Sequence, residues 1–198
     1  DNNATTRVDD EVIQEMLPFF GEFYANPSSM HTFGGQLGKR IEESRQKVAD
    51  LINAEPDEIV FTSCGTESDN SAVHFALNAY PEKRHIITSN VEHPAINNLL
   101  KYLKQKKGYR LTFVPVDQKG LFDPDVLYES LSDDTALVSL MLANNETGVI
   151  FPIAEVAEKI KEKGILFHTD AVQAAGKVPV DVKTAKVDFL SLSGHKIH

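Results

Sequence analysis

The chain has 198 residues, 41% of them hydrophobic and 25% charged, a composition typical of a globular protein that excludes a disordered chain. No apolar run approaches the roughly 20 residues that span a bilayer, and we predict no membrane interaction. The formal net charge of −9 would repel nucleic acid phosphates, so we also predict no nucleic-acid binding.

The single cysteine, Cys64, excludes an internal disulfide framework and predicts a reducing, cytoplasmic setting. The chain begins at Asp1 without a methionine, and a strand pattern at Asp188–Leu192 runs directly into its last residues. A chain end at that point would leave a half-built sheet edge. We therefore expect this sequence to be the N-terminal part of a longer chain.

Short apolar runs rich in β-branched residues alternate with longer segments of helical period. This alternation predicts an α/β fold with a mainly parallel sheet sandwiched by helices, whose ligands bind beyond the carboxyl ends of the strands. The predicted elements, in chain order, are a helix at Gly35–Ile52, a strand at Glu58–Thr62, a helix at Glu67–Ala79, a strand at His85–Ser89, a helix at Ala95–Lys106, a strand at Arg110–Val114, a helix at Pro124–Leu131, a strand at Ala136–Leu142, a helix at Ile153–Lys163, and strands at Ile165–Thr169 and Asp188–Leu192.

The first polar motif, Cys64 to Asn70, links a predicted strand to a predicted helix. Gly65 permits close backbone approach, and the helix N-terminus beside Thr66 would attract a phosphate. The same residues fit a capping box, with Thr66 as the N-cap and Asp69 three positions later, and the two interpretations are compatible. The motif is neither a G-x-G-x-x-G sequence nor a P-loop, which disfavours dinucleotides and nucleoside triphosphates.

Two further motifs lie at strand ends. Asp170, in the segment His168 to Gln173, is either a carboxylate facing a ligand site or the cap of the next turn. Lys196, which follows Ser193, Gly194 and His195, is either a desolvated, nucleophilic amine or an ordinary surface lysine. A phosphate cradle, a carboxylate and a lysine at neighbouring strand ends together suit pyridoxal phosphate (PLP), because the carboxylate would keep the pyridine nitrogen protonated.

The motifs also resemble those of a known family, the cysteine desulfurases of the NifS/IscS type. These belong to the class V aminotransferase group of fold-type I PLP enzymes. The resemblance implies that residues 1–198 are the N-terminal portion of the large, cofactor-binding domain, with its remainder and the small domain outside this sequence. The matching segments span the chain in the family's order and are Asp1–Thr6, Asn26–Ser29 with His31, Phe61–Ser63, Thr66–Asn70, Glu92–His93, Asn144–Gly148, Asp170–Gln173 and Ser193–Lys196.

The resemblance implies specific roles for these residues. Lys196 would form the Schiff base with PLP, and Asp170 would pair with the pyridine nitrogen. His93, taken alone a histidine typical of a strand end, would stack on the ring and relay protons. The remaining cofactor contacts would come from Asn145 and Gln173 at ring substituents and from Gly65, Thr66, Ser193 and His195 at the phosphate.

The implied activity is the removal of sulfur from L-cysteine, giving L-alanine and an enzyme persulfide. The implied partners are a second copy of the chain, with the loop Asn26–His31 at the dimer boundary, and a sulfur acceptor such as an iron–sulfur scaffold. Selenocysteine lyase, an aminotransferase for small amino acids, and a non-catalytic sulfur-relay or scaffold module stay open as alternatives.

Cys64 stands where relatives have a small residue, and we interpret it as a buried filler rather than the sulfur-accepting nucleophile. By the resemblance, that nucleophile and the arginine that holds the substrate carboxylate lie beyond residue 198. No Cys/His pattern has zinc spacing, and we predict no metal site.

Overall fold

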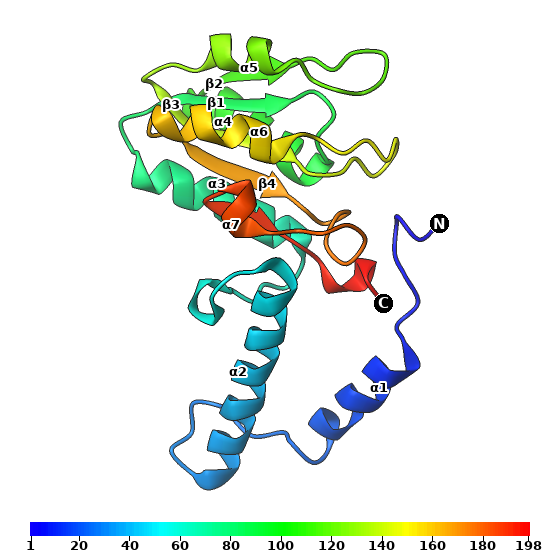
Figure 1. Ribbon diagram of the computed structural model, residues 1–198. Helices are drawn as coiled ribbons and strands as arrows, with labels where there is room; N and C mark the ends of the chain where they lie inside the picture. The colour runs from blue at the N-terminus through cyan, green and yellow to red at the C-terminus, as the bar shows by residue number, and fades with distance from the viewer. The chain divides into compact units, whose positions relative to one another are not determined.

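The computed structural model describes residues 1–198, and the chain divides into two units (Figure 1). The larger unit is Thr62–Ser193. The smaller unit combines Asp1–Phe61 with Gly194–His198. No helix of either unit has the length and apolar character needed to cross a membrane.

The larger unit is built on a five-stranded sheet in the order β2-β1-β3-β4-β5, with every neighbouring pair parallel. The predicted mainly parallel sheet is therefore confirmed, and five of the six predicted strands form it. Two of these strands have the predicted first and last residues, and each of the other three differs from its prediction by one residue at either end. The strands are β1 (His85–Ser89), β2 (Arg110–Val114), β3 (Thr135–Met141), β4 (Leu166–Asp170) and β5 (Phe189–Ser191).

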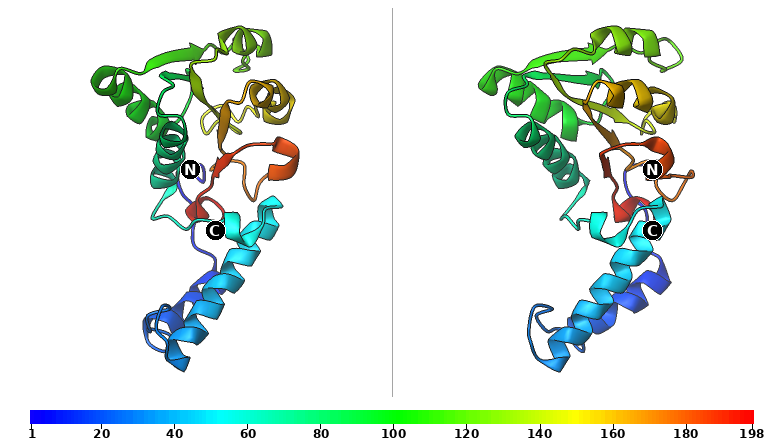
Figure 2. Two further views of the ribbon diagram at one scale, coloured as in Figure 1. Left: turned by 90° about the vertical axis from the view of Figure 1, so that its left-hand side faces the viewer. Right: turned by 60° about the vertical axis from the view of Figure 1, so that its left-hand side comes forward.

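Helices cover both faces of this sheet, as Figure 2 shows. Successive strand residues point to opposite faces, so Ile86 packs with α3 and α4 while Ile87 packs with α5 and α6. The same alternation at Leu137 and Val138 divides the core into two clusters. The helices are α3 (Gly65–Ala79), α4 (Pro94–Lys107), α5 (Pro124–Ser130), α6 (Ile153–Glu162) and the short α7 (Val182–Ala185).

Local sequence explains where these helices begin and end. α4 starts with Pro94 in its first turn and stops at Gly108, whose φ of 73° suits glycine. Lys104, Lys106 and Lys107 lie in the last turn of α4, where the helix dipole favours positive charge. α6 begins after Pro152 and is followed by Gly164 at φ 62°.

The smaller unit contains α1 (Asp10–Met16), η1 (Leu17–Phe20), α2 (Thr32–Ile52), η2 (Pro56–Glu58) and η3 (Gly194–Lys196). The sequence predicted α2 but missed α1, which buries no side chain and so lacks the apolar stripe that identifies a helix against a core.

The predicted strand at Glu58–Thr62 is wrong. Glu58 ends η2, and the residues after it pair with no strand of the chain. Val60 and Phe61 are 73% and 52% exposed, so this apolar run has no sheet neighbour to bury it. An apolar run of this kind forms a strand only where a neighbouring strand is available to pair with it.

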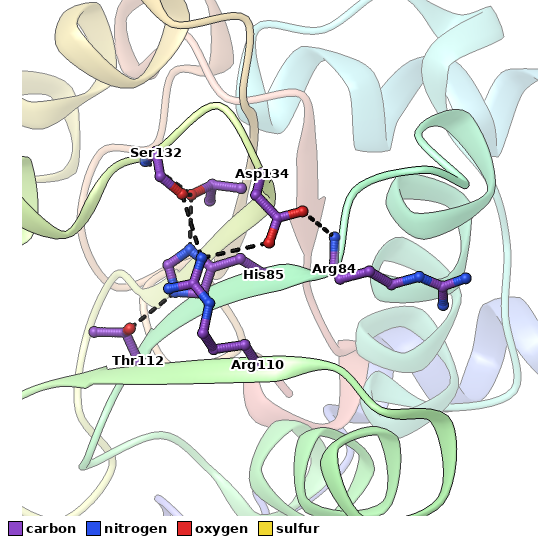
Figure 3. A network of polar contacts seen from close by, with 7 residues as sticks. Arg84, His85, Arg110, Thr112, Ser132 and Asp134 are labelled. Carbon is purple, nitrogen blue, oxygen red and sulfur yellow. Dashed lines mark hydrogen bonds and ion pairs between the residues drawn. The ribbon is translucent and has the colours of Figure 1, made fainter.

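A polar network, which we call the amino-end network, ties the starting ends of β1, β2 and β3 together (Figure 3). The fully buried His85 ring hydrogen-bonds the Thr135 and Thr112 hydroxyls, each at 2.8 Å. The carboxyl of Asp134 accepts the Arg84 backbone N–H at 2.9 Å and pairs with Arg110 at 3.4 Å. Burial lowers the pKa of His85 to about 4, so the ring is neutral.

Candidate active site

Asp170 is the last residue of β4 and lies at the carboxyl edge of the sheet, in register with Met141 of β3 and Ser191 of β5. The residue is 6% exposed, and its Oδ1 accepts a hydrogen bond from the Val172 N–H at 2.9 Å. Its carbonyl oxygen accepts from the Leu142 N–H at 2.8 Å. Asp170 therefore caps the following turn, one of the two roles that the sequence left open, and its carboxyl is buried at the sheet edge.

The N-terminus of α3 lies against the loops that follow β4 and β5. A Cβ atom on Gly65 would stand 3.2 Å from Val172 Cγ2 and 3.6 Å from Ser193 Cβ, so a larger residue would press on both loops. The positive end of the α3 dipole lies here and favours a negatively charged group. The structure thus brings Gly65, Thr66 and Ser193 to one place suited to a phosphate group.

The capping box proposed for Thr66 and Asp69 is wrong. α3 begins at Gly65, and its N-cap residue is Cys64 in an extended conformation. The side chain that reaches back is that of Glu67, whose carboxyl accepts the Ser63 N–H at 2.5 Å. Because the helix starts earlier than the box requires, Asp69 falls in its second turn and faces the interior at 2% exposure.

The expectation that Cys64 is a buried filler is also wrong, because its thiol is exposed. The N-cap position places this side chain outside the first turn of α3. A hydrogen bond from the Glu67 backbone N–H, together with the Ser63 hydroxyl, lowers the pKa of the Cys64 thiol.

His93 is the N-cap residue of α4 and is exposed. Its Nδ1 accepts a hydrogen bond from the Ala95 N–H at 3.2 Å, which assigns the proton of a neutral ring to Nε2. The loop that carries His93 is fastened by the buried neighbour Glu92, whose Oε1 accepts the Ser89 hydroxyl at 2.6 Å and the Met141 N–H at 3.1 Å. The carboxyl of Glu92 thereby joins the ends of β1 and β3.

Asn145 lies in the loop after β3, and its side-chain amide donates to Glu146 Oε1 at 2.6 Å. The preceding Asn144 fixes this loop. Its amide donates to the Val91 carbonyl at 3.1 Å, and its Oδ1 accepts the Thr147 N–H at 2.9 Å. The loops that carry Asn145 and His93 are therefore held together through Asn144.

Gln173 lies in the turn three residues after Asp170, and its Oε1 accepts a hydrogen bond from Lys177 Nζ at 2.7 Å. The backbone of this turn is tied by the Ala174 and Ala175 N–H groups, which both donate to the Ala171 carbonyl at 2.9 Å. The turn therefore has a fixed backbone beside the buried end of β4.

His195 and Lys196 belong to the smaller unit, where the segment Asn3–Thr6 binds them. The amine of Lys196 donates to the carbonyl oxygens of Asn3 and Ala4, the latter at 2.9 Å. His195 Nδ1 lies 3.1 Å from the Thr5 hydroxyl, and the His195 carbonyl accepts the Thr6 N–H at 3.0 Å. The Asp1–Thr6 motif of the sequence is therefore the segment that positions the lysine motif.

From the sequence, neither Asp69 nor Glu92 was assigned a role in the active site, and with Asp170 these residues form what we call the carboxyl-end cluster. Burial is the main cause that raises the pKa of Asp69 and that of Glu92 to about 8, and the charge of Asp170 adds to both shifts. One oxygen of each carboxyl, Asp69 Oδ1 and Glu92 Oε2, is buried without a hydrogen-bond donor.

The fully buried His168 lies beside Asp69. Its ring bonds the Ser139 hydroxyl at 2.9 Å and the Ser191 hydroxyl at 3.1 Å, and burial lowers its pKa to about 3. A serine or histidine inside an otherwise apolar strand, as in Ala136–Leu142, was the available signal for this buried polar layer.

The class-V aminotransferase family model matches residues 1–198. The chain is 56% identical over 198 residues to a cysteine desulfurase of Trichormus azollae, covering 100% of this chain and 49% of that protein. It is 55% identical to the cysteine desulfurase NifS of Azotobacter vinelandii, covering 100% of this chain and again 49% of that protein. The chain therefore spans about half the length of these curated relatives.

Solved structures of related proteins have the same fold as this chain. A NifS-like protein superposes with a TM-score of 0.96 at 44% identity, covering 100% of this chain and 55% of that chain. A structure described as SspA in complex with cysteine gives a TM-score of 0.94 at 36% identity, covering 99% of this chain and 56% of that one. The likeness confirms the fold of a fold-type I enzyme, and the family is PLP-dependent. The chain belongs to the class-V aminotransferase family.

Proposed function

We propose that the protein is a PLP-dependent cysteine desulfurase, which takes sulfur from L-cysteine and leaves L-alanine and a protein persulfide. The single observation that carries the proposal is Asp170, a carboxyl that is 6% exposed and fixed at the end of β4 in a chain 56% identical to a curated cysteine desulfurase. The similar structure of SspA in complex with cysteine supports the same choice of substrate.

The residues at the carboxyl edge fit PLP. The positive end of the α3 dipole beside Gly65 and Ser193 suits a phosphate, and a fixed carboxyl such as Asp170 suits a protonated ring nitrogen. When bound, PLP supplies an electron sink for negative charge at the substrate Cα. We propose that the cofactor is held by Gly65, Thr66, Ser193 and His195 at the phosphate, Asp170 at the ring nitrogen, Asn145 and Gln173 at ring substituents, His93 at the ring face and Lys196 by covalent attachment.

Two residues would move protons. His93 accepts the Ala95 N–H at Nδ1, which leaves its Nε2 to exchange a proton with the substrate. The Lys196 amine, positioned by the Asn3 and Ala4 carbonyls, is the second proton carrier. Cys64 would not accept sulfur in this proposal, because it caps the helix that binds the phosphate.

We propose a homodimer, supported by apolar side chains that the smaller unit leaves uncovered. No residue of α1 is buried, and Leu17 and Phe20 of the adjoining η1 are 53% and 77% exposed. Such a surface is typical of a protein interface. Sedimentation that finds an active monomer would contradict this part of the proposal.

We further propose that the protein acts in the cytoplasm and passes sulfur to an acceptor such as an iron–sulfur scaffold. The presence of one cysteine, Cys64, in 198 residues supports a reducing compartment.

The test of the function is Lys196→Ala in the full-length protein, with Lys101→Ala, an exposed lysine of α4, as the matched control. Borohydride reduction followed by peptide mapping should find cofactor on Lys196 in the wild type and in the control. The Lys196→Ala variant should carry no covalent cofactor and should release no sulfide or alanine from L-cysteine. Cofactor recovered on another lysine, or a wild type that turns over L-selenocysteine but not L-cysteine, would contradict the assignment.

A further inference from the structure

The three residues of the carboxyl-end cluster come from α3 (Asp69), the loop between β1 and α4 (Glu92) and the end of β4 (Asp170), and they meet across the ends of adjacent strands. Asp170 is paired in register with Met141 on one side and with Ser191 on the other. The Met141 N–H donates to the Glu92 carboxyl, and the Ser191 hydroxyl hydrogen-bonds the Asp69 carboxyl. Glu92 and Asp69 therefore flank Asp170, and none of the three residues is more than 6% exposed.

No cation balances the two flanking carboxyls. Neither Asp69 nor Glu92 makes an ion pair with lysine or arginine, and the basic group beside Asp69 is His168, whose Nε2 lies 3.6 Å from Asp69 Oδ1. The His168 ring is neutral, because burial without a compensating charge disfavours the imidazolium.

The hydrogen bonds of the flanking carboxyls also do not suit an ionised state. An ionised carboxylate needs donors at both oxygens, yet Glu92 Oε2 and Asp69 Oδ1 are buried without one. Burying an unpaired charge costs far more than burying a neutral acid. If either group were ionised, its charge would also repel that of Asp170 and favour protonation of Asp170.

We propose that Asp69 and Glu92 are positioning residues that stand as neutral acids on either side of Asp170, so that the three carboxyls carry one negative charge and Asp170 holds it. The consequence for the cofactor ring nitrogen rests on the proposed function. The protonation states of the three carboxyls do not depend on it, and the apoprotein displays them.

Infrared spectroscopy of the full-length apoprotein tests this directly, because the C=O stretch of a protonated carboxyl is separate from the bands of carboxylates. Glu92→Gln and Asp69→Asn keep the shape and neutrality of each acid. Near neutral pH, each variant should lose one protonated-carboxyl band relative to the wild type. The matched control is Asp117→Asn, an exposed acid whose pKa is lowered by backbone N–H groups, and it should lose a carboxylate band instead.

The wild type alone gives a second measurement if a variant fails to fold. Its protonated-carboxyl bands should fade as the pH rises through about 8, the pKa to which burial raises both Asp69 and Glu92. In Asp170→Asn the same fading should move to lower pH, because loss of the neighbouring negative charge makes ionisation of Asp69 and Glu92 easier, and a move to higher pH would contradict the proposal.

A wild type with no protonated-carboxyl band near neutral pH would overturn the proposal, as would a fading that is unchanged in Asp170→Asn. An enzyme that shows both bands but does not act on L-cysteine would refute the proposed function and leave this inference standing. An enzyme that acts on L-cysteine without the bands would refute the inference alone.

Discussion

The two ends of the sheet in the larger unit are both polar, yet they are built differently. In the amino-end network, both ring nitrogens of His85 meet hydroxyls and the Asp134 charge meets Arg110 (Figure 3). In the carboxyl-end cluster, Asp69 and Glu92 each keep a buried oxygen without a donor. A closed set of hydrogen bonds indicates a structural role, whereas buried groups left unsatisfied beside a ligand site indicate function.

The two regions also have opposite effects on stability as pH changes. The pKa of His85 is about 4 in the folded state, below its ordinary 6.5, so the unfolded state binds the proton first and stability falls as pH drops from 6.5 to 4. The pKa of Glu92 is about 8, above its ordinary 4.5, so the unfolded state loses its proton first. The contribution of Glu92 is therefore greatest below pH 4.5 and is lost as pH rises to 8.

The largest expected effect is that of Asp170→Ala in the full-length protein. Loss of the buried carboxyl should lower turnover of L-cysteine by orders of magnitude, because in the proposed function Asp170 is the carboxylate that keeps the ring nitrogen protonated. The free energy of unfolding should change by about 1 kcal/mol, the typical value of the lost bond to the Val172 N–H. Near-normal turnover with reduced stability would mean that Asp170 is a cap and that the two ends of the sheet do not differ in function.

Glu92→Gln should flatten the alkaline side of the stability profile. Between pH 4.5 and 8, the window set by the pKa of Glu92, the wild type should lose stability as pH rises and the variant should not. The free energy of unfolding of the variant should therefore rise relative to that of the wild type. At roughly 1.4 kcal/mol for each pH unit, the shift is up to about 5 kcal/mol. Denaturant unfolding at several pH values and one protein concentration measures it, and a difference that does not depend on pH would show that Glu92 is ionised in the folded protein.

His85→Ala should act on stability and spare catalysis. It removes a fully buried ring and leaves the Thr112 and Thr135 hydroxyls without their partner, at a cost of about 3 kcal/mol. Turnover per folded molecule should stay at the wild-type value, because His85 starts β1 at the opposite end of the sheet from Asp170. A fall in turnover at a constant folded fraction would show that the amino-end network also contributes to catalysis.

The smallest effect is expected from Asp123→Ala, which touches neither polar region. Asp123 caps α5 and accepts the Asp125 N–H at 2.9 Å. Loss of this cap should lower the free energy of unfolding by about 1 kcal/mol at every pH, with no change in turnover. Thermal unfolding of Asp123→Ala, measured together with the other variants, gives the contribution of a helix cap alone to the free energy of unfolding. A change in turnover would show that stability and activity cannot be separated in this protein.

Local patterns predicted most of the sheet. β1 and β2 match the prediction to the residue, because each is a short apolar or β-branched run bounded by polar or turn residues. The run at Glu58–Thr62 has the same local character and is no strand, since pairing depends on a neighbour that the local sequence does not specify. The short α1 was missed for a related reason, because its apolar residues face no core.

The site was predicted residue by residue through motifs, but its buried layer was not. Asp69 was taken as part of a cap because the helix was expected to begin at Glu67, and the earlier start at Gly65 turns that side chain inward. Glu92 and Asp69 come to flank Asp170 through the strand order β1-β3-β4-β5, which arises from long-range pairing. Residues in one motif can be found by sequence, whereas groups that meet through the sheet cannot.

The ¹⁵N chemical shift of the pyridine nitrogen, measured in full-length protein loaded with labelled PLP, reports directly whether Asp170 keeps that nitrogen protonated. We expect a protonated nitrogen near neutral pH in the wild type, because in our proposal Asp170 holds the single charge of the carboxyl-end cluster. We expect an unprotonated nitrogen in Asp170→Ala and a protonated one in His85→Ala. An unprotonated nitrogen in the wild type, or a shift unchanged by Asp170→Ala, would refute the proposed role of Asp170.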